Sequence, residues 1–217
     1  LDGPVLGEVP AISLHEDAPL YERPMAPPVD LATCQEDTPE GHLPESNDVS
    51  EDLLSLMQSQ EWITSQYDSQ LFLNTVAGPG SNAAVLRLKH PVSGEDTGRG
   101  LAVTTDGNHR WCAVDPKIGT AMTVAESMLN LACVGAEPRA LVNCLNFGNP
   151  ENPNVMWQLS EAVDGMAEAC SQFNIPVVGG NVSLYNESQG KNIDPTPIVG
   201  LIGVINNLKT PPPEVTW

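Results

Sequence analysis

Two short polar segments hold the residues that are best suited to bind a ligand. The first is Asn146–Pro150, and the second is Gly179–Ser183, which reads Gly-Gly-Asn-Val-Ser. Each follows an apolar run, and loops at strand ends commonly carry binding residues. A glycine lets a phosphate or a base approach the backbone, an asparagine oxygen suits Mg²⁺, and a serine hydroxyl can donate to a phosphate or ribose oxygen. The residue types alone nevertheless favour an ordinary turn at the second segment.

The elements that must position these segments are predicted from apolar periodicity. Buried strands are expected at Ala140–Leu145 and Ile175–Val178, and a long apolar strand at Thr196–Ile205. The clearest helix is Pro153–Phe173, which Asn152 would cap. Its predicted inward face consists of Val155, Leu159, Ala162, Val163, Met166, Cys170 and Phe173. Both polar segments therefore lie at ends of strands that this helix connects.

Earlier in the chain, a further strand is predicted at Gly100–Thr105 and a helix at Thr120–Val134. Ser50 is expected to cap a packing helix that runs to about Ser65.

Composition divides the chain into four parts. Residues 1–14 are interpreted as the tail of a preceding domain, with a strand at Pro4–Val9, and residues 15–48 as an acidic, proline-rich linker. The linker has too few large apolar residues to form a packed unit, so we expect it to lie along another domain. Residues 49–207 form the predicted domain, and residues 208–217 the start of a linker to a missing C-terminal domain.

The formal net charge of −19 argues against binding to nucleic acid or to anionic membranes. Among the five cysteines, Cys133 and Cys170 fall on apolar helix faces, which favours buried thiols over disulfides or zinc ligands. The sequence contains neither a signal-peptide pattern nor an apolar run of about 18 residues, so a cytoplasmic setting is expected.

The two motifs at the polar segments also resemble a known family. Cys-Leu-Asn-Phe-Gly-Asn-Pro from Cys144 and Gly-Gly-Asn-Val-Ser-Leu-Tyr-Asn from Gly179 are similar to motifs of phosphoribosylformylglycinamidine synthase, also called formylglycinamide ribonucleotide amidotransferase. The likeness runs from about Leu71 to Asn206 and points to the first domain of the second, non-catalytic half of the synthetase. It implies an α+β fold of the aminoimidazole-ribonucleotide-synthetase-like N-terminal domain type: a mixed, largely antiparallel sheet with helices packed on one face.

The resemblance implies four site residues and no catalytic residue. Asn143 and Gly180 match ATP-binding positions, Asn181 matches a Mg²⁺ ligand, and Ser183 matches a residue that contacts formylglycinamide ribonucleotide. The family has an aspartate where this chain has Asn143. We expect the two polar segments to converge on one pocket, with the side chains of Asn143 and Asn181 on the same side.

Two further positions depart from the catalytic half of the family. Where that half has a catalytic histidine segment and a Mg²⁺-binding aspartate, this chain has Asp106 and Asn130. His109 is expected to be an exposed loop residue or a stacking partner for Trp111 rather than a general base.

The parent reaction that the resemblance implies is the conversion of formylglycinamide ribonucleotide, glutamine and ATP to formylglycinamidine ribonucleotide in de novo purine biosynthesis. The implied cofactors are ATP and Mg²⁺. The implied partners are the remaining synthetase domains, a glutaminase subunit or domain, and a small helper subunit. Two alternatives stay open: a non-catalytic scaffold half that holds a structural Mg-nucleotide, and another ATP-binding enzyme of the same superfamily. The isolated chain is expected to be inactive and to associate through an uncovered apolar sheet face.

Overall fold

The computed structural model of the chain describes residues 3–36, 48–57, 59 and 61–208. The predicted C-terminal linker, from residue 209 onward, and residues 37–47 of the predicted acidic linker lie outside the described residues. The elements, in chain order, are η1 Ala11–Leu14, α1 Leu31–Glu36, α2 Val49–Leu56, α3 Glu61–Thr64, η3 Leu71–Leu73, β1 Thr75–Ala77, β2 Ala84–Lys89, β3 Asp96–Asp106, α4 His109–Val114, α5 Pro116–Cys133, β4 Glu137–Asn146, α6 Pro153–Phe173, β5 Val177–Ser183, β6 Glu187–Ser188, β7 Lys191–Asn192 and β8 Thr196–Ile205.

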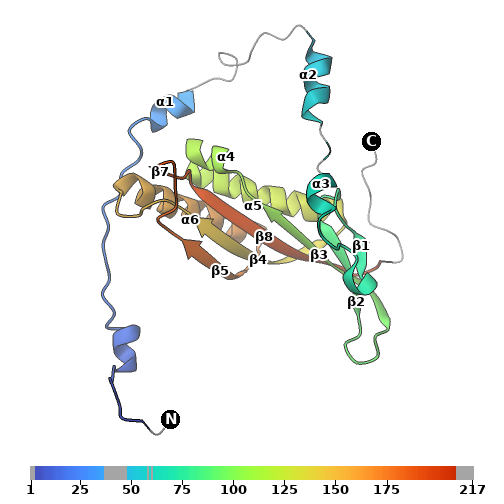
Figure 1. Cartoon of the computed structure of the whole chain (residues 1–217), viewed down its shortest axis with the longest axis horizontal. Helices are drawn as coiled ribbons and strands as arrows, with labels where there is room; N and C mark the ends of the chain where they lie inside the picture. Colours follow the sequence, from blue (N-terminus) through green and yellow to red (C-terminus); the bar gives the residue numbers. More distant parts are fainter. Residues whose placement is uncertain (1–2, 37–47, 58, 60, 209–217) are drawn as a thin grey trace.

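A six-stranded sheet with the order β1-β2-β3-β8-β4-β5 forms the body of the domain. All neighbouring strands are antiparallel except β4 and β5, which are parallel and are connected by α6. Helices α4, α5 and α6 lie on one face of this sheet, and α5 contacts β3, β4 and β8 (Figure 1). The predicted α+β class, with a mixed, largely antiparallel sheet and helices on one face, is confirmed.

The two faces of the sheet differ because side chains alternate along each strand. On β8, Val199 and Leu201 point into the helix layer and are fully buried, whereas their neighbours are half-buried. The core under the helices also contains the fully buried Phe147, Leu131, Leu141, Val85 and Val124. The opposite face, called the open face below, has none of the helices α4, α5 and α6 on it, although the end of α3, at Thr64, lines a hollow there with Ala84 and Leu86. On this face, Leu86 is 38% exposed and Val142 is 37% exposed.

The open face makes self-association the expected behaviour of the isolated chain. Contiguous apolar surface that water would otherwise cover favours association. Light scattering of the purified chain should therefore show dimers or larger species, and the double substitution Leu86→Lys and Val142→Lys should shift the distribution toward monomer. A stable monomer of the unsubstituted chain in dilute buffer would contradict this expectation.

The two long helices follow local rules closely. Helix α6 begins at Pro153 and ends at Phe173, as predicted. Helix α5 begins at Pro116, earlier than expected, because the Asp115 carboxylate accepts a hydrogen bond from Ile118 N at 2.9 Å and so caps the helix.

Some predicted core positions of the helices are wrong. Val163 and Phe173 of α6 are 44% and 41% exposed, because α6 packs against α5 and the sheet along a narrower stripe than the sequence suggested. Cys133, at the end of α5, is exposed, whereas Cys170 is buried as predicted.

The N-terminal region differs most from expectation. The predicted strand at Pro4–Val9 is irregular and exposed. Asp48 rather than Ser50 caps α2, since the Asp48 carboxylate accepts from Ser50 N at 3.0 Å. The predicted packing helix is two short helices, α2 and α3, that contain no buried residue among those described.

Part of the acidic linker lies along this domain. Ala26 N donates to the Pro153 carbonyl oxygen at 3.1 Å, and Gln35 Nε2 donates to the Val114 carbonyl oxygen at 3.1 Å. The linker therefore crosses the start of α6 and the end of α4. No helix in the described ranges is long and apolar enough to span a membrane.

Candidate functional site

The predicted site residues lie on the two parallel strands, β4 and β5. The segment Gly179–Ser183 was expected to be a turn, but it continues as part of β5. Its residues stay extended because β4 supplies main-chain partners: Asn143 lies opposite Gly180, Cys144 opposite Asn181, and Asn146 opposite Ser183. Strand β5 is at the edge of the sheet, so its outer main-chain groups have no strand partner in the described chain.

Asn143 and Gly180 are in direct contact on the helix side of the sheet. The Asn143 side chain is half-buried, and its Nδ2 lies 3.4 Å from the Sδ of Met166 on α6. A Cβ built on Gly180 would overlap Asn143 Oδ1 and would lie 2.8 Å from Asn143 Cγ. Gly180 therefore makes room for the asparagine side chain.

Asn181 and Ser183 lie on the other side of the strand. Gly180 faces the helix side of the sheet together with Asn143. Because side chains alternate along β5, Asn181 and Ser183 point to the open face. Asn181 is exposed there, and Ser183 is half-buried. The expectation that the side chains of Asn143 and Asn181 share one side is wrong for this chain. Ser183 is not sealed in the core, since it is half-buried.

The loops that follow β4 and β5 are held together by asparagine side chains. Asn192 Oδ1 accepts from Asn149 N at 2.8 Å, and a Cβ on Gly148 would come within 2.5 Å of the Asn192 side chain. Asn146 Nδ2 donates to the Thr196 carbonyl oxygen at 3.1 Å. Asn192 and Thr196 were not among the residues predicted to form the site. The concentration of asparagines around the two motifs was the signal that could have found them, since asparagine can bond to main chain in non-helical segments.

A second polar cluster joins the end of β3 to α5. The Asp106 carboxylate accepts hydrogen bonds at 2.7 Å from each of Thr104 Oγ1, Ser127 Oγ and Asn130 Nδ2. The two positions that depart from the catalytic half of the resembled family, Asp106 and Asn130, are thus bonded to each other. Neutral donors satisfy the carboxylate, so this cluster serves to hold the end of β3 against α5.

His109 is exposed, as predicted, but it begins helix α4 and is not in a loop. The reason is the preceding Asn108, whose Oδ1 accepts from Trp111 N at 3.2 Å and caps the helix.

Glu126, which lies near the Asp106 cluster, should make the stability of the protein depend on pH. Burial and the nearby Asp106 carboxylate raise the pKa of Glu126. A carboxyl whose pKa is higher in the folded state lowers stability when it is ionised, and this penalty disappears as the pH falls below its unfolded pKa. Glu126→Gln should therefore raise the free energy of unfolding at pH 7 by up to about 0.5 kcal/mol, a small value because solvent screens the group. Urea titrations at pH 7 and pH 4 would test it; an equal gain at both pH values would contradict it.

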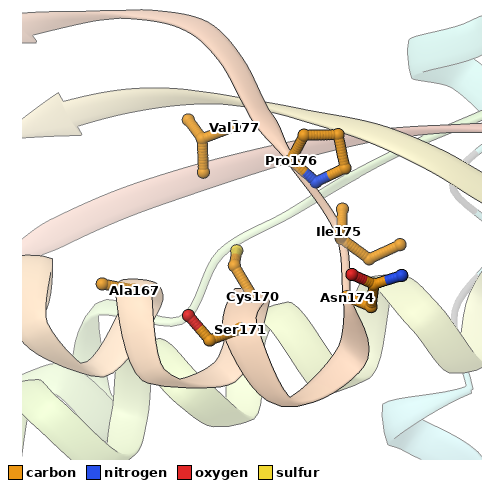
Figure 2. Close-up of a pocket in the computed structure, with 7 residues that line it drawn as sticks. All are labelled: Ala167, Cys170, Ser171, Asn174, Ile175, Pro176 and Val177. Carbon is orange, nitrogen blue, oxygen red and sulfur yellow. The ribbon is translucent and has the colours of Figure 1, made fainter.

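The hollow at the far end of α6 contains none of the predicted site residues. It has a volume of about 580 Å³ and is lined by Ala167, Cys170, Ser171, Asn174, Ile175, Pro176 and Val177 (Figure 2). The lining is mostly apolar, and burial raises the pKa of the Cys170 thiol, which leaves it a poor nucleophile.

The described residues contain no group of three or more His, Cys, Asp or Glu that could hold a metal ion. An exposed asparagine such as Asn181 could supply one oxygen ligand to Mg²⁺, provided that phosphate oxygens and water supply the others.

Comparison with known proteins agrees with the fold. Residues 80–205 match the model of the family described as AIR synthase related protein, N-terminal domain. The curated Moorella thermoacetica protein phosphoribosylformylglycinamidine synthase subunit PurL is 47% identical over 214 residues, which is 96% of this chain and 28% of that protein.

Solved structures of Thermotoga maritima proteins are also similar. The structure of PurLQS matches over 94% of this chain and 30% of that chain, with 32% identity and a TM-score of 0.68. PurL complexed with ATP matches over 68% and 23%, with 36% identity and a TM-score of 0.59. PurL complexed with FGAR matches over 78% and 26%, with 34% identity and a TM-score of 0.58. The chain thus spans less than a third of the length of these relatives. It belongs to the family of AIR synthase related proteins and contains their N-terminal domain.

Proposed function

We propose that this chain is part of the ATP-dependent ligase that converts formylglycinamide ribonucleotide, glutamine and ATP to formylglycinamidine ribonucleotide. The observation that carries the proposal is the β4–β5 pair, which holds Asn143, Gly180, Asn181 and Ser183 within three residues of one another on adjacent strands. The 47% identity to a PurL subunit and the likeness to PurL structures with ATP and with FGAR support it.

The proposed roles follow from where each group lies. Asn143 and Gly180 would bind ATP at the edge of the sheet, where Gly180 is exposed and has no side chain beside the asparagine amide. Asn181 would contribute its amide oxygen to Mg²⁺, and Ser183 would donate its hydroxyl proton to an oxygen of the ribonucleotide. ATP, when bound, would supply the phosphoryl group that activates the substrate amide oxygen. None of the four residues is proposed to be catalytic.

The proposed partners complete the site. Strand β5 offers a free edge and the open face is apolar, so both fit a second domain. We assign these surfaces to the remaining synthetase domains, and further contacts to a glutaminase subunit or domain and a small helper subunit, all in the cytoplasm. The likeness to PurLQS supports an assembly of this kind.

A second candidate is a scaffold half that holds a structural Mg-nucleotide and catalyses nothing. The Asp106 cluster favours it, because three neutral donors occupy the carboxylate at the end of β3. Calorimetric titration of the full-length protein with Mg-ADP, with and without the ribonucleotide, separates the two candidates. Mutually dependent binding supports the shared active site, whereas a tight nucleotide that never turns over and ignores the ribonucleotide supports the scaffold. Absence of any nucleotide binding would overturn both.

A further inference from the structure

One asparagine joins the two strand-end loops at the candidate site. Asn186 Nδ2 donates to the Phe147 carbonyl oxygen at 3.0 Å and to the Ser183 carbonyl oxygen at 2.9 Å. The main chain repeats the connection, since Asn186 N donates to the Phe147 carbonyl oxygen at 3.2 Å and Phe147 N donates to the Ser183 carbonyl oxygen at 3.0 Å. Phe147 is fully buried and Asn186 is half-buried. The end of β5 is thus fixed to the core through Asn186.

The turn that presents Asn186 is conformationally costly. Tyr185 has a φ of +61°, a left-handed conformation that residues with a Cβ rarely adopt. The turn is held on one side by the bond from Tyr185 N to the Gly148 carbonyl oxygen at 2.9 Å, and on the other by the Asn186 amide. Strained backbone of this kind persists only where its surroundings determine it, and it is concentrated at functional sites.

The same amide reaches the Ser183 hydroxyl. Asn186 Nδ2 can donate a hydrogen bond to Ser183 Oγ at 3.1 Å. Alternatively, the Ser183 hydroxyl can donate to Asn186 Oδ1 at 3.3 Å. The amide has two hydrogens and three acceptors, so the hydrogen that it donates to Oγ is shared with the Ser183 carbonyl oxygen. With this donation to Oγ, the hydroxyl proton is left for another acceptor. Without such an acceptor, the proton can return to Asn186 Oδ1. The pair is therefore arranged so that Ser183 can donate outward without leaving its oxygen unsatisfied.

We propose that Asn186 is a positioning residue for the proposed reaction: its amide orients the Ser183 hydroxyl to donate a hydrogen bond to an oxygen of the sugar-phosphate substrate. This inference rests on the proposed function, because it takes Ser183 as the residue that contacts the substrate. Asn186 itself does not touch the substrate. It acts by holding Ser183 Oγ, and its bonds to the Phe147 and Ser183 carbonyl oxygens keep the amide in place for that role.

The test is steady-state kinetics of the full-length enzyme with the variants Asn186→Ala, Ser183→Ala and the double variant. Asn186→Ala should raise KM for the ribonucleotide about tenfold, as expected for the loss of one hydrogen bond to the substrate, and should leave KM for ATP within about twofold. Ser183→Ala should have a similar effect. The double variant should be no worse than Ser183→Ala, because Asn186 acts through the serine.

Asn152→Ala is the matched control, since Asn152 lies in the same pair of loops but its side chain makes no capping hydrogen bond. It should leave both KM values unchanged. If Asn186→Ala fails to fold, Asn186→Asp keeps the size of the side chain, removes its donors, and should give the same rise in KM.

The outcomes separate the inference from the function on which it rests. A rise in KM with Ser183→Ala but not with either Asn186 variant overturns the positioning role and leaves the proposed function standing. Effects that multiply in the double variant overturn it as well, because they show that the two residues act independently. No change with Ser183→Ala, or no ribonucleotide-dependent ADP formation by the unsubstituted enzyme, overturns the proposed function itself.

Discussion

Replacing Gly165 with alanine should lower the free energy of unfolding by about 3 kcal/mol or more, even though alanine is the better helix former. Gly165 lies in the middle of α6, at the point where α6 contacts the start of α5. A Cβ there would overlap the Lys117 carbonyl oxygen and would lie 2.8 Å from the carbonyl carbon. These are main-chain atoms, so no side chain can rotate away. The two helices would have to separate.

The expected loss exceeds the helix-propensity gain. Alanine in place of glycine stabilises an exposed helix position by about 1 kcal/mol, and the overlap costs more because it opens the α5–α6 contact along its length. Separation would also lengthen the Lys117–Glu168 ion pair, which is 2.5 Å in the folded protein, although this exposed pair contributes little. Urea titration of Gly165→Ala against the unsubstituted chain measures the difference.

Asp164→Ala is the control for this prediction. Asp164 is the neighbouring residue on the same helix and is exposed, so its replacement should change stability by no more than about 0.5 kcal/mol. A Gly165→Ala variant as stable as Asp164→Ala would show that α5 and α6 can separate without loss of stability. It would contradict the close contact between Gly165 and the main chain of Lys117.

Local rules predicted the elements that carry a strong periodic pattern. The bounds of α6 and β8 follow from the sequence because a proline near the start and a clear apolar pattern mark each of them, although Asn152 makes no side-chain capping hydrogen bond at the start of α6. Gly165 shows the limit of such rules. A glycine in a helix interior is expected to destabilise the helix. The presence of Gly165 is explained only by the close approach of α5, which no local sequence pattern encodes.

The site was predicted less completely than the fold. The motifs lie on one pair of adjacent strands, but the sequence placed a turn at Gly179–Ser183 where β5 continues. Polar and glycine residues suggest turns, and here the parallel partner β4 supplies the hydrogen bonds that keep them extended. Alternation then separates Asn143 from Asn181, a consequence that follows only once both segments are known to be strands. The role of Asn186 was not predicted for a similar reason, since one of its partners, Phe147, comes from the other loop.

The second large effect is expected at the contact between Gly180 and Asn143. Gly180→Ala should lower nucleotide affinity at least about tenfold and stability by about 1–3 kcal/mol. The new Cβ would overlap Asn143 Oδ1 and force the amide to leave its position beside Met166. The overlap involves a side chain, so it can be relieved by a second substitution. Gly180→Ala combined with Asn143→Ala should recover most of the stability but not the nucleotide affinity.

Gly179→Ala is the matched control, because it adds the same methyl group one residue earlier in β5. The nearest atom to a Cβ at Gly179 is Val142 Cγ1 at 3.9 Å, which is an ordinary van der Waals contact. Thermal unfolding and calorimetric titration with Mg-ATP should therefore leave Gly179→Ala close to the unsubstituted protein. If Gly179→Ala and Gly180→Ala behave alike, the effect comes from lost glycine flexibility in the strand. If the Asn143→Ala partner restores affinity as well as stability, Asn143 only packs against Gly180 and does not bind the nucleotide.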